Sequence, residues 1–123
     1  MTTRYLDLET LLLIVEEAGL QSVRDLGLLE SAAMRPQTSV FGDDAYPTID
    51  EKAAVLMESI VRNYPLADGN KRLGWIAMKT FYLLNGIELP ARHDEAYDLV
   101  IGIAEGRIDY HRSAATLAQW TNP

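Results

Sequence analysis

The feature that most restricts the fold is a pair of long amphipathic segments separated by only a few residues. In residues 50–63 and again in residues 70–84, apolar side chains recur every three or four positions. That spacing is typical of a helix with one buried face. The expected buried stripes are Ala53, Leu56, Met57, Ile60 and Val61, followed by Leu73, Ile76, Ala77, Thr80 and Leu84. The sequence therefore predicts two core helices joined by a short turn.

Shorter segments with the same spacing flank this pair. They predict helices over residues 7–18, 27–34, 94–106 and 109–120, with Asp94 capping the third and either Thr48 or Asp50 capping the first long helix. Residues 36–47 are the one long irregular stretch and are expected to form a flap or hairpin over a site. We therefore expect an all-α fold, a compact bundle of about six helices, with residues 1–123 forming a single domain.

Composition excludes several classes of function. The chain has no cysteine, which rules out disulfides, thiolate metal sites and a cysteine nucleophile. Its formal net charge is −7 and its basic residues form no run beyond Lys71-Arg72, so nucleic acid is not expected as a direct partner. No segment resembles a signal peptide or is apolar for long enough to cross a bilayer. A cytoplasmic location without a membrane partner is the expectation.

The residues that carry chemistry lie where the second long helix begins. A helix N-terminus has free backbone N–H groups and the positive end of the helix dipole, which together favour an anion. Gly69 lets a phosphate approach the backbone, Asn70 offers an amide, and Lys71 and Arg72 add two cations. Asp68 supplies the oxygen ligand that Mg²⁺ prefers. These are the parts of a nucleotide-phosphate site, although an ordinary capping turn would use similar residues.

The segment from Tyr64 to Arg72, which reads YPLADGNKR, resembles the signature of the Fic/Doc family, H-x-F-x-[DE]-x-N-[GK]-R. The resemblance extends to residues 25–32, to Arg35-Pro36 and to the Leu-Leu-Asn-Gly ending at residues 83–86. It implies a helical bundle in which the signature lies between two core helices. That fold agrees with the helices expected from apolar spacing alone.

Two positions resemble the Doc branch of the family. Adenylyl-transferring members typically carry Gly and a second Arg where this chain has Lys71 and Trp75. The resemblance therefore implies a toxin that uses ATP to phosphorylate a threonine of elongation factor Tu and so blocks translation. Asp68 would hold Mg²⁺, and residues 69–72 would bind the ATP phosphates. The implied partner is a cognate antitoxin, whose disordered C-terminal segment folds along the toxin.

Tyr64 departs from the signature, because it occupies the position of the family's catalytic histidine. That histidine acts as the general base, whereas a tyrosine hydroxyl, with a pKa of about 10, stays protonated at neutral pH. His93 and His111 lie far from the segment in sequence and are not nominated as replacements. The chain is therefore expected to be severely impaired or inactive. Either it is a natural degenerate member, or Tyr64 is an inactivating substitution, which we favour because a single-base codon change converts His to Tyr.

Two alternatives stay open beside the kinase. One is an adenylyl-transferring enzyme with the same fold, and the other is a non-catalytic family member that binds an antitoxin. The expected partner surface is the groove between the early helices and residues 36–47. Aromatic residues that could anchor a partner, each equally explained by core packing, are Phe41, Tyr46, Trp75, Tyr82 and Trp120.

Overall fold

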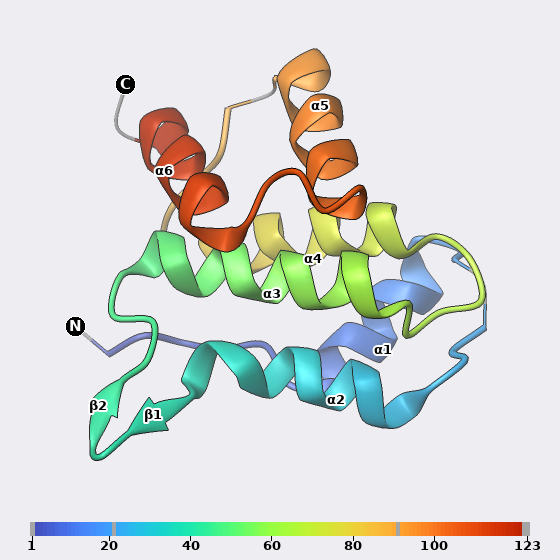
Figure 1. Ribbon diagram of the computed structural model, residues 1–123. Helices are drawn as coiled ribbons and strands as arrows, with labels where there is room; N and C mark the ends of the chain where they lie inside the picture. The colour runs from blue at the N-terminus through green and yellow to red at the C-terminus, as the bar shows by residue number, and fades with distance from the viewer. Residues whose placement is uncertain (1, 21, 91, 122–123) are drawn as a thin grey trace.

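Helix α3 (Ile49–Asn63) lies at the centre of the fold (Figure 1). The computed structural model describes residues 2–20, 22–90 and 92–121. In the figure, α1 and α2 lie on one side of the α3–α4 pair, and α5 and α6 lie on the other. The other elements are α1 (Leu8–Glu17), α2 (Leu26–Met34), the short 3₁₀ helix η1 (Arg35–Gln37), β1 (Ser39–Val40), β2 (Asp43–Asp44), α4 (Asn70–Leu84), α5 (His93–Ala104) and α6 (Tyr110–Thr121). The predicted all-α bundle of about six helices is confirmed.

Burial on every side of α3 explains its central place. The predicted stripe is confirmed, since its five residues are at most 1% exposed. Burial also extends around the helix to Ala54 and Val55, and even to the charged residues Lys52 and Glu58. A helix buried all round is one that other helices cover, and here α2, α4, α5 and α6 all pack against it.

The buried face of α4 differs from the predicted one. Leu73 and Ala77 are buried as expected, but Ile76, Thr80 and Leu84 are only partly buried. The face that packs inward instead consists of Leu73, Gly74, Ala77, Met78, Phe81 and Tyr82. This rotation buries two larger apolar side chains at positions 78 and 81 in place of the hydroxyl of Thr80, which stabilises the core more.

Gly74 lies where α4 approaches α3 closely. A Cβ at this position would come within 2.6 Å of Val61 Cγ2 and 3.3 Å of the Met57 carbonyl oxygen. We predict that Gly74→Val lowers the free energy of unfolding by about 1–3 kcal/mol, because the added methyl groups overpack the interface. Denaturant unfolding measures this change. The control Leu83→Val adds the same β-branch on the same helix at a 65% exposed position, and an equal loss there would contradict the packing argument.

The predicted hairpin in residues 36–47 is confirmed as β1 paired antiparallel with β2, with Val40 opposite Asp43. Buried Lys52 of α3 holds its base, donating to the Tyr46 carbonyl oxygen and to Asp44 Oδ2, the latter at 3.1 Å. In Figure 1 the hairpin lies at the end of α3 opposite to the turn that leads into α4. The hairpin therefore does not cover that turn.

Most helix starts are as predicted, with one correction. Thr48, rather than Asp50, caps α3 by accepting a hydrogen bond from the Glu51 amide. The predicted Asp94 cap of α5 is wrong, because α5 begins at His93 and places Asp94 inside its first turn. An acidic residue in a first turn also stabilises the helix through its dipole, so the same sequence pattern fits both positions.

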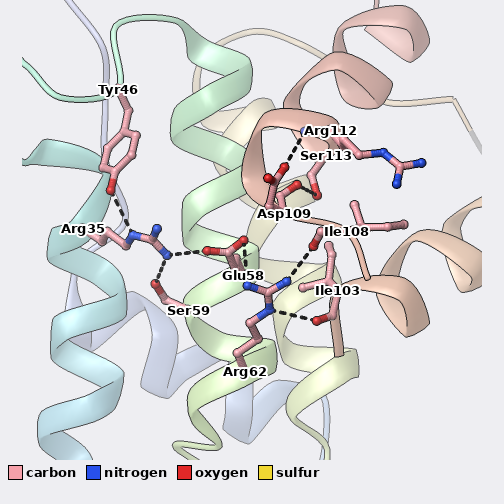
Figure 2. A network of polar contacts seen from close by, with 10 residues as sticks. All are labelled: Arg35, Tyr46, Glu58, Ser59, Arg62, Ile103, Ile108, Asp109, Arg112 and Ser113. Carbon is pink, nitrogen blue, oxygen red and sulfur yellow. Dashed lines mark hydrogen bonds and ion pairs between the residues drawn. The ribbon is translucent and has the colours of Figure 1, made fainter. Parts of the chain in front are cut away.

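A partly buried network of ion pairs and hydrogen bonds ties the end of α5 and the loop after it to α3 (Figure 2). Glu58 of α3 contacts Arg35 Nη1 at 3.1 Å and Arg62 Nη1 at 3.4 Å. Arg62 also donates to the carbonyl oxygens of Ile103, at 2.9 Å, and Ile108, at 2.7 Å. The Arg62 guanidinium thus satisfies carbonyls where α5 ends, and it fixes α5 relative to α3, the helix that ends just before residue 64.

Candidate functional site

The turn between α3 and α4 changes direction at Tyr64. This residue follows the last residue of α3 in the left-handed conformation, with φ 54° and ψ 56°, and its side chain is 52% exposed. A left-handed backbone is uncommon for a residue other than glycine and marks a position that the surrounding structure enforces. Two residues later, Leu66 is 1% exposed and anchors the turn in the core. The turn therefore presents residue 64 to solvent while burying residue 66.

The chain before α2 pairs with this turn through the backbone. Ala67 donates its amide to the Ser22 carbonyl oxygen at 3.0 Å. The Pro65 carbonyl oxygen accepts from the amides of Arg24, at 2.7 Å, and Asp25, at 3.0 Å. These bonds hold residues 22–25 against the turn, although about forty residues separate the two segments in the sequence.

Arg24 adds a side-chain clamp to the same turn. Its Nε donates to the Tyr64 carbonyl oxygen at 2.8 Å, and its Nη2 donates to the Asn63 carbonyl oxygen at 3.2 Å. A guanidinium at these two carbonyls stabilises the end of α3 and fixes the backbone of residue 64. No sequence pattern pointed to this residue.

We predict that Arg24→Ala lowers the free energy of unfolding by roughly 1 kcal/mol, a small value because both hydrogen bonds are exposed to solvent. The amide of Leu66 should then exchange with solvent faster, as the turn loosens. Arg107→Ala is a matched control, since the Arg107 side chain is exposed and its hydrogen bond and ion pair to the described residues are both with the exposed Glu105. Equal effects of the two substitutions would show that Arg24 is an ordinary surface residue.

The N-terminus of α4 is open to an anion. Helices α1, α2 and α3 each have a side-chain cap, from Asp7, Asp25 and Thr48 respectively. Helix α4 has none: Gly69 is its N-cap, at φ 90°, and the first amide bonded within the helix is that of residue 73. Within the described residues, the amides of residues 70–72 therefore have no protein acceptor. Free amides and a positive helix end make an anion site.

Asn70 turns away from this open end. It is 7% exposed, its Oδ1 accepts from the Leu66 amide at 2.9 Å, and its Nδ2 donates to the Leu66 carbonyl oxygen at 3.0 Å. The side-chain amide that the sequence assigned to a phosphate is thus used to hold the turn. Only the backbone amide of Asn70 remains at the open end.

Asp68 is exposed beside the open end of α4. Its Oδ1 accepts from the Gly69 amide at 2.9 Å, and its other oxygen makes no hydrogen bond to the described residues. Among those residues, no group of three or more His, Cys, Asp or Glu side chains is placed to hold a metal ion. One carboxylate fits Mg²⁺ when water and ligand phosphates complete the coordination, and it does not fit a metal held by protein alone.

Two pockets have lining residues at the start of α4 in common. The turn pocket has a volume of about 340 Å³ and is lined by Tyr64 and residues 67–72. A second cavity of about 300 Å³, the α4–α5 pocket, shares Lys71 and Arg72 with it. The remaining residues of the α4–α5 pocket are Trp75, Lys79, Arg92, His93, Ala96, Tyr97, Val100 and Ile101.

The structure also places the other residues that the sequence left open. His93 lines the α4–α5 pocket, close to the signature cations, although it lies about twenty residues from them in sequence. His111 instead stacks on Tyr110, with ring centroids 4.0 Å apart. No sequence pattern pointed to His93 as a pocket residue, because its position depends on how α5 packs against α4.

The five aromatic anchors have different environments. Tyr82 and Trp120 are buried in the core, whereas Phe41 is fully exposed at the tip of the hairpin. Tyr46 packs edge-on against Tyr110, and Trp75 packs edge-on against Trp120. A groove of about 380 Å³ does lie between the early helices and α3, lined by Ser31, Met34, Arg35, Thr38, Ser59 and Asn63.

The fold and turn define a class of protein: a helical bundle with an uncapped helix N-terminus, a carboxylate and an exposed tyrosine in the turn between its two core helices. A family model described as the Fic/DOC family matches residues 5–82, which include the whole turn. The chain is also 45% identical over 120 residues to Toxin Doc of Mycolicibacterium smegmatis, in an alignment covering 94% of this chain and 92% of that relative. The chain belongs to the Fic/Doc family. Within the described residues, no helix is long and apolar enough to cross a membrane.

Proposed function

We propose that the chain is a Doc-type toxin of a toxin–antitoxin pair, acting in the cytoplasm, with the architecture of an ATP-dependent kinase for a threonine of elongation factor Tu. The observation that carries this proposal is the uncapped N-terminus of α4 beside Lys71 and Arg72. The 45% identity to a protein named Toxin Doc supports the choice of branch. A phosphoryl group is the ligand that such a helix end and two cations neutralise best.

In the proposed reaction, the acceptor threonine oxygen forms a bond to the terminal phosphorus of ATP. The bond from that phosphorus to the ADP oxygen breaks, and the threonine proton passes to a base. The amides of residues 70–72, together with Lys71 and Arg72, would hold the transferred phosphoryl group and neutralise its charge. Asp68 would hold Mg²⁺, which when bound neutralises the phosphate oxygens. Most of this catalysis is positioning, which a clamped turn supplies.

Tyr64 occupies the position of the base and lines the turn pocket. A protonated phenol does not accept the threonine proton, so we infer that this chain binds nucleotide but transfers phosphate very slowly. The left-handed backbone at residue 64 would present a histidine at the same place. We therefore attribute the slow phosphate transfer to the Tyr64 side chain and not to the backbone of the turn.

The experiment that tests this proposal is Tyr64→His, assayed with Mg²⁺, ATP and purified elongation factor Tu. Mass spectrometry should find one phosphate on a threonine, and expression of the variant should arrest growth. Tyr64→Phe is the matched control and should give neither result. Addition of AMP in place of phosphate would support the adenylyl-transferring alternative, and an unmodified target would contradict both enzymes.

A non-catalytic, antitoxin-binding role is the second candidate, and Tyr64 itself favours it. Under this proposal the cognate antitoxin segment binds the chain tightly, and the groove between α2 and α3 is the proposed surface. The prediction is tight binding by the unmodified chain together with no activity after Tyr64→His. A growth-arresting revertant would reject this role.

A further inference from the structure

Tyr64 carries the one hydroxyl among the residues that line the turn pocket. The other lining residues are Ala67, Asp68, Gly69, Asn70, Lys71 and Arg72. The Tyr64 side chain is 52% exposed. Within the described residues, the side-chain hydrogen bond to Tyr64 is accepted by its carbonyl oxygen, from Arg24, and not by its hydroxyl. A tyrosine hydroxyl that is free of protein partners is available as a nucleophile.

The pocket brings this hydroxyl to the proposed phosphate site. The uncapped start of α4 and the cations Lys71 and Arg72 belong to the same pocket as Tyr64. Its volume of about 340 Å³ is small for a ligand site, so a phosphoryl group bound there is close to all the residues that line it. Arg24 also holds the left-handed backbone of residue 64, which fixes the position of the phenol at the edge of the pocket.

Tyrosine at the position of the base removes a proton acceptor and supplies a nucleophile. A general base contributes about 10²–10⁴-fold to a rate. A nucleophile held beside its target can gain more, since effective molarities for well-oriented groups reach about 10⁵–10⁸ M. Phosphoryl transfer also passes through a loose transition state, so that positioning counts for more than activation of the nucleophile. The fixed phenol is therefore favoured over the hydroxyl of a threonine that must first dock.

We propose that Tyr64 is an autophosphorylation site. Its phenolic oxygen forms a bond to the terminal phosphorus of ATP, the bond from that phosphorus to the ADP oxygen breaks, and the phenol proton passes to water. The products are phosphotyrosine at residue 64 and ADP. This inference rests on the proposed function, which places the ATP phosphates at the turn.

The modified side chain would occupy the anion site itself. A phosphate on tyrosine carries a charge of about −1.5 to −2 and three acceptor oxygens. The free amides of residues 70–72 and the cations Lys71 and Arg72 are the groups that bind such a charge. Each chain therefore reacts once, and the product excludes a second ATP from the turn.

The test incubates the chain, with Tyr64 in place, with Mg²⁺ and ATP in the absence of any other protein. Intact-mass measurement should find at most one added phosphate per chain, and tandem mass spectrometry should place it on Tyr64. The rate per chain should not depend on protein concentration, because the transfer is intramolecular. A rate proportional to protein concentration, or phosphate on other residues only, would overturn the proposal.

Two variants and an internal control sharpen this test. Tyr64→Phe should remain unlabelled. Arg72→Ala keeps the phenol but removes a cation, and it should slow labelling by roughly tenfold or more. Tyr97 is 68% exposed but does not line the turn pocket, so it should carry no phosphate. Labelling of Tyr97 to the same extent, or full labelling of Arg72→Ala, would show that exposure and not the pocket selects the tyrosine.

Nucleotide binding gives a measurement that does not depend on the reaction rate. Calorimetry on the phosphorylated chain, freed of nucleotide, should find ATP bound more weakly than before incubation by roughly tenfold or more, because like charges then meet at the turn. The same incubation should not change the affinity of Tyr64→Phe for ATP. Unchanged affinity of a fully phosphorylated chain would contradict a phosphate at the start of α4.

The outcomes separate this inference from the proposed function. If Tyr64→His phosphorylates elongation factor Tu while the chain with Tyr64 acquires no phosphate, the autophosphorylation site is overturned and the proposed function stands. AMP on Tyr64 would overturn phosphoryl transfer in favour of the adenylyl-transferring alternative. A chain that bound no ATP would overturn the site and the proposed function together.

Discussion

Replacing Asn70 by alanine is expected to lower the free energy of unfolding by about 2–4 kcal/mol, because two buried backbone groups lose their partners. Those groups are the amide and the carbonyl oxygen of Leu66, which the Asn70 side chain bonds at 2.9 and 3.0 Å. Water does not replace it easily, since both residues are buried. Denaturant unfolding monitored by circular dichroism measures the change.

The matched control for this substitution is Asn63→Ala. Asn63 is exposed at the end of α3, and its side chain makes no hydrogen bond to the described residues. Its replacement should change stability by less than about 0.5 kcal/mol. If Asn63→Ala and Asn70→Ala were equally destabilising, Asn70 would not be holding the turn, and the phosphate role expected from the sequence would regain support.

The central pair of helices was predictable from local features. Apolar spacing predicts α3 and α4, and the structure ends α3 at Asn63 and begins α4 at Asn70, as expected. Pro65 cannot continue a helix, and Gly69 adopts the positive φ that the start of α4 requires. These signals act within a few residues of one another. The end of α3 and the start of α4 can therefore be predicted without knowledge of tertiary contacts.

The remaining features depend on packing between distant segments. The clamp by Arg24 requires the segment before α2 to pair with the turn, and the α4–α5 pocket requires residues 92–101 to stand against α4. The inward direction of the Asn70 side chain also follows from packing. The core buries Leu66, and the backbone of Leu66 then needs hydrogen-bond partners, which the Asn70 side chain supplies. Sequence spacing identified the residues at the turn but not the direction in which each one points.

The largest functional effect is expected from Tyr64→His. A positioned general base typically contributes about 10²–10⁴-fold to a rate, so the revertant should transfer phosphate faster by that factor. The turn needs no rebuilding, because its anchors are Leu66 and Asn70, and neither contacts the Tyr64 side chain through a hydrogen bond. The initial rate of phosphothreonine formation measures the gain. Tyr64→Phe should stay at the rate of the unmodified chain.

The pH dependence of the revertant provides a further check on the role of residue 64. Only a neutral imidazole accepts a proton, and the ordinary pKa of histidine is about 6.5. The rate should therefore be low below that pH, rise as the imidazole loses its proton, and level off above it. The chain with Tyr64 should show no such rise. If the rate gain of the revertant were independent of pH, the gain would come from removal of the larger phenol ring. Residue 64 would then act by leaving room for the acceptor hydroxyl and not by taking its proton.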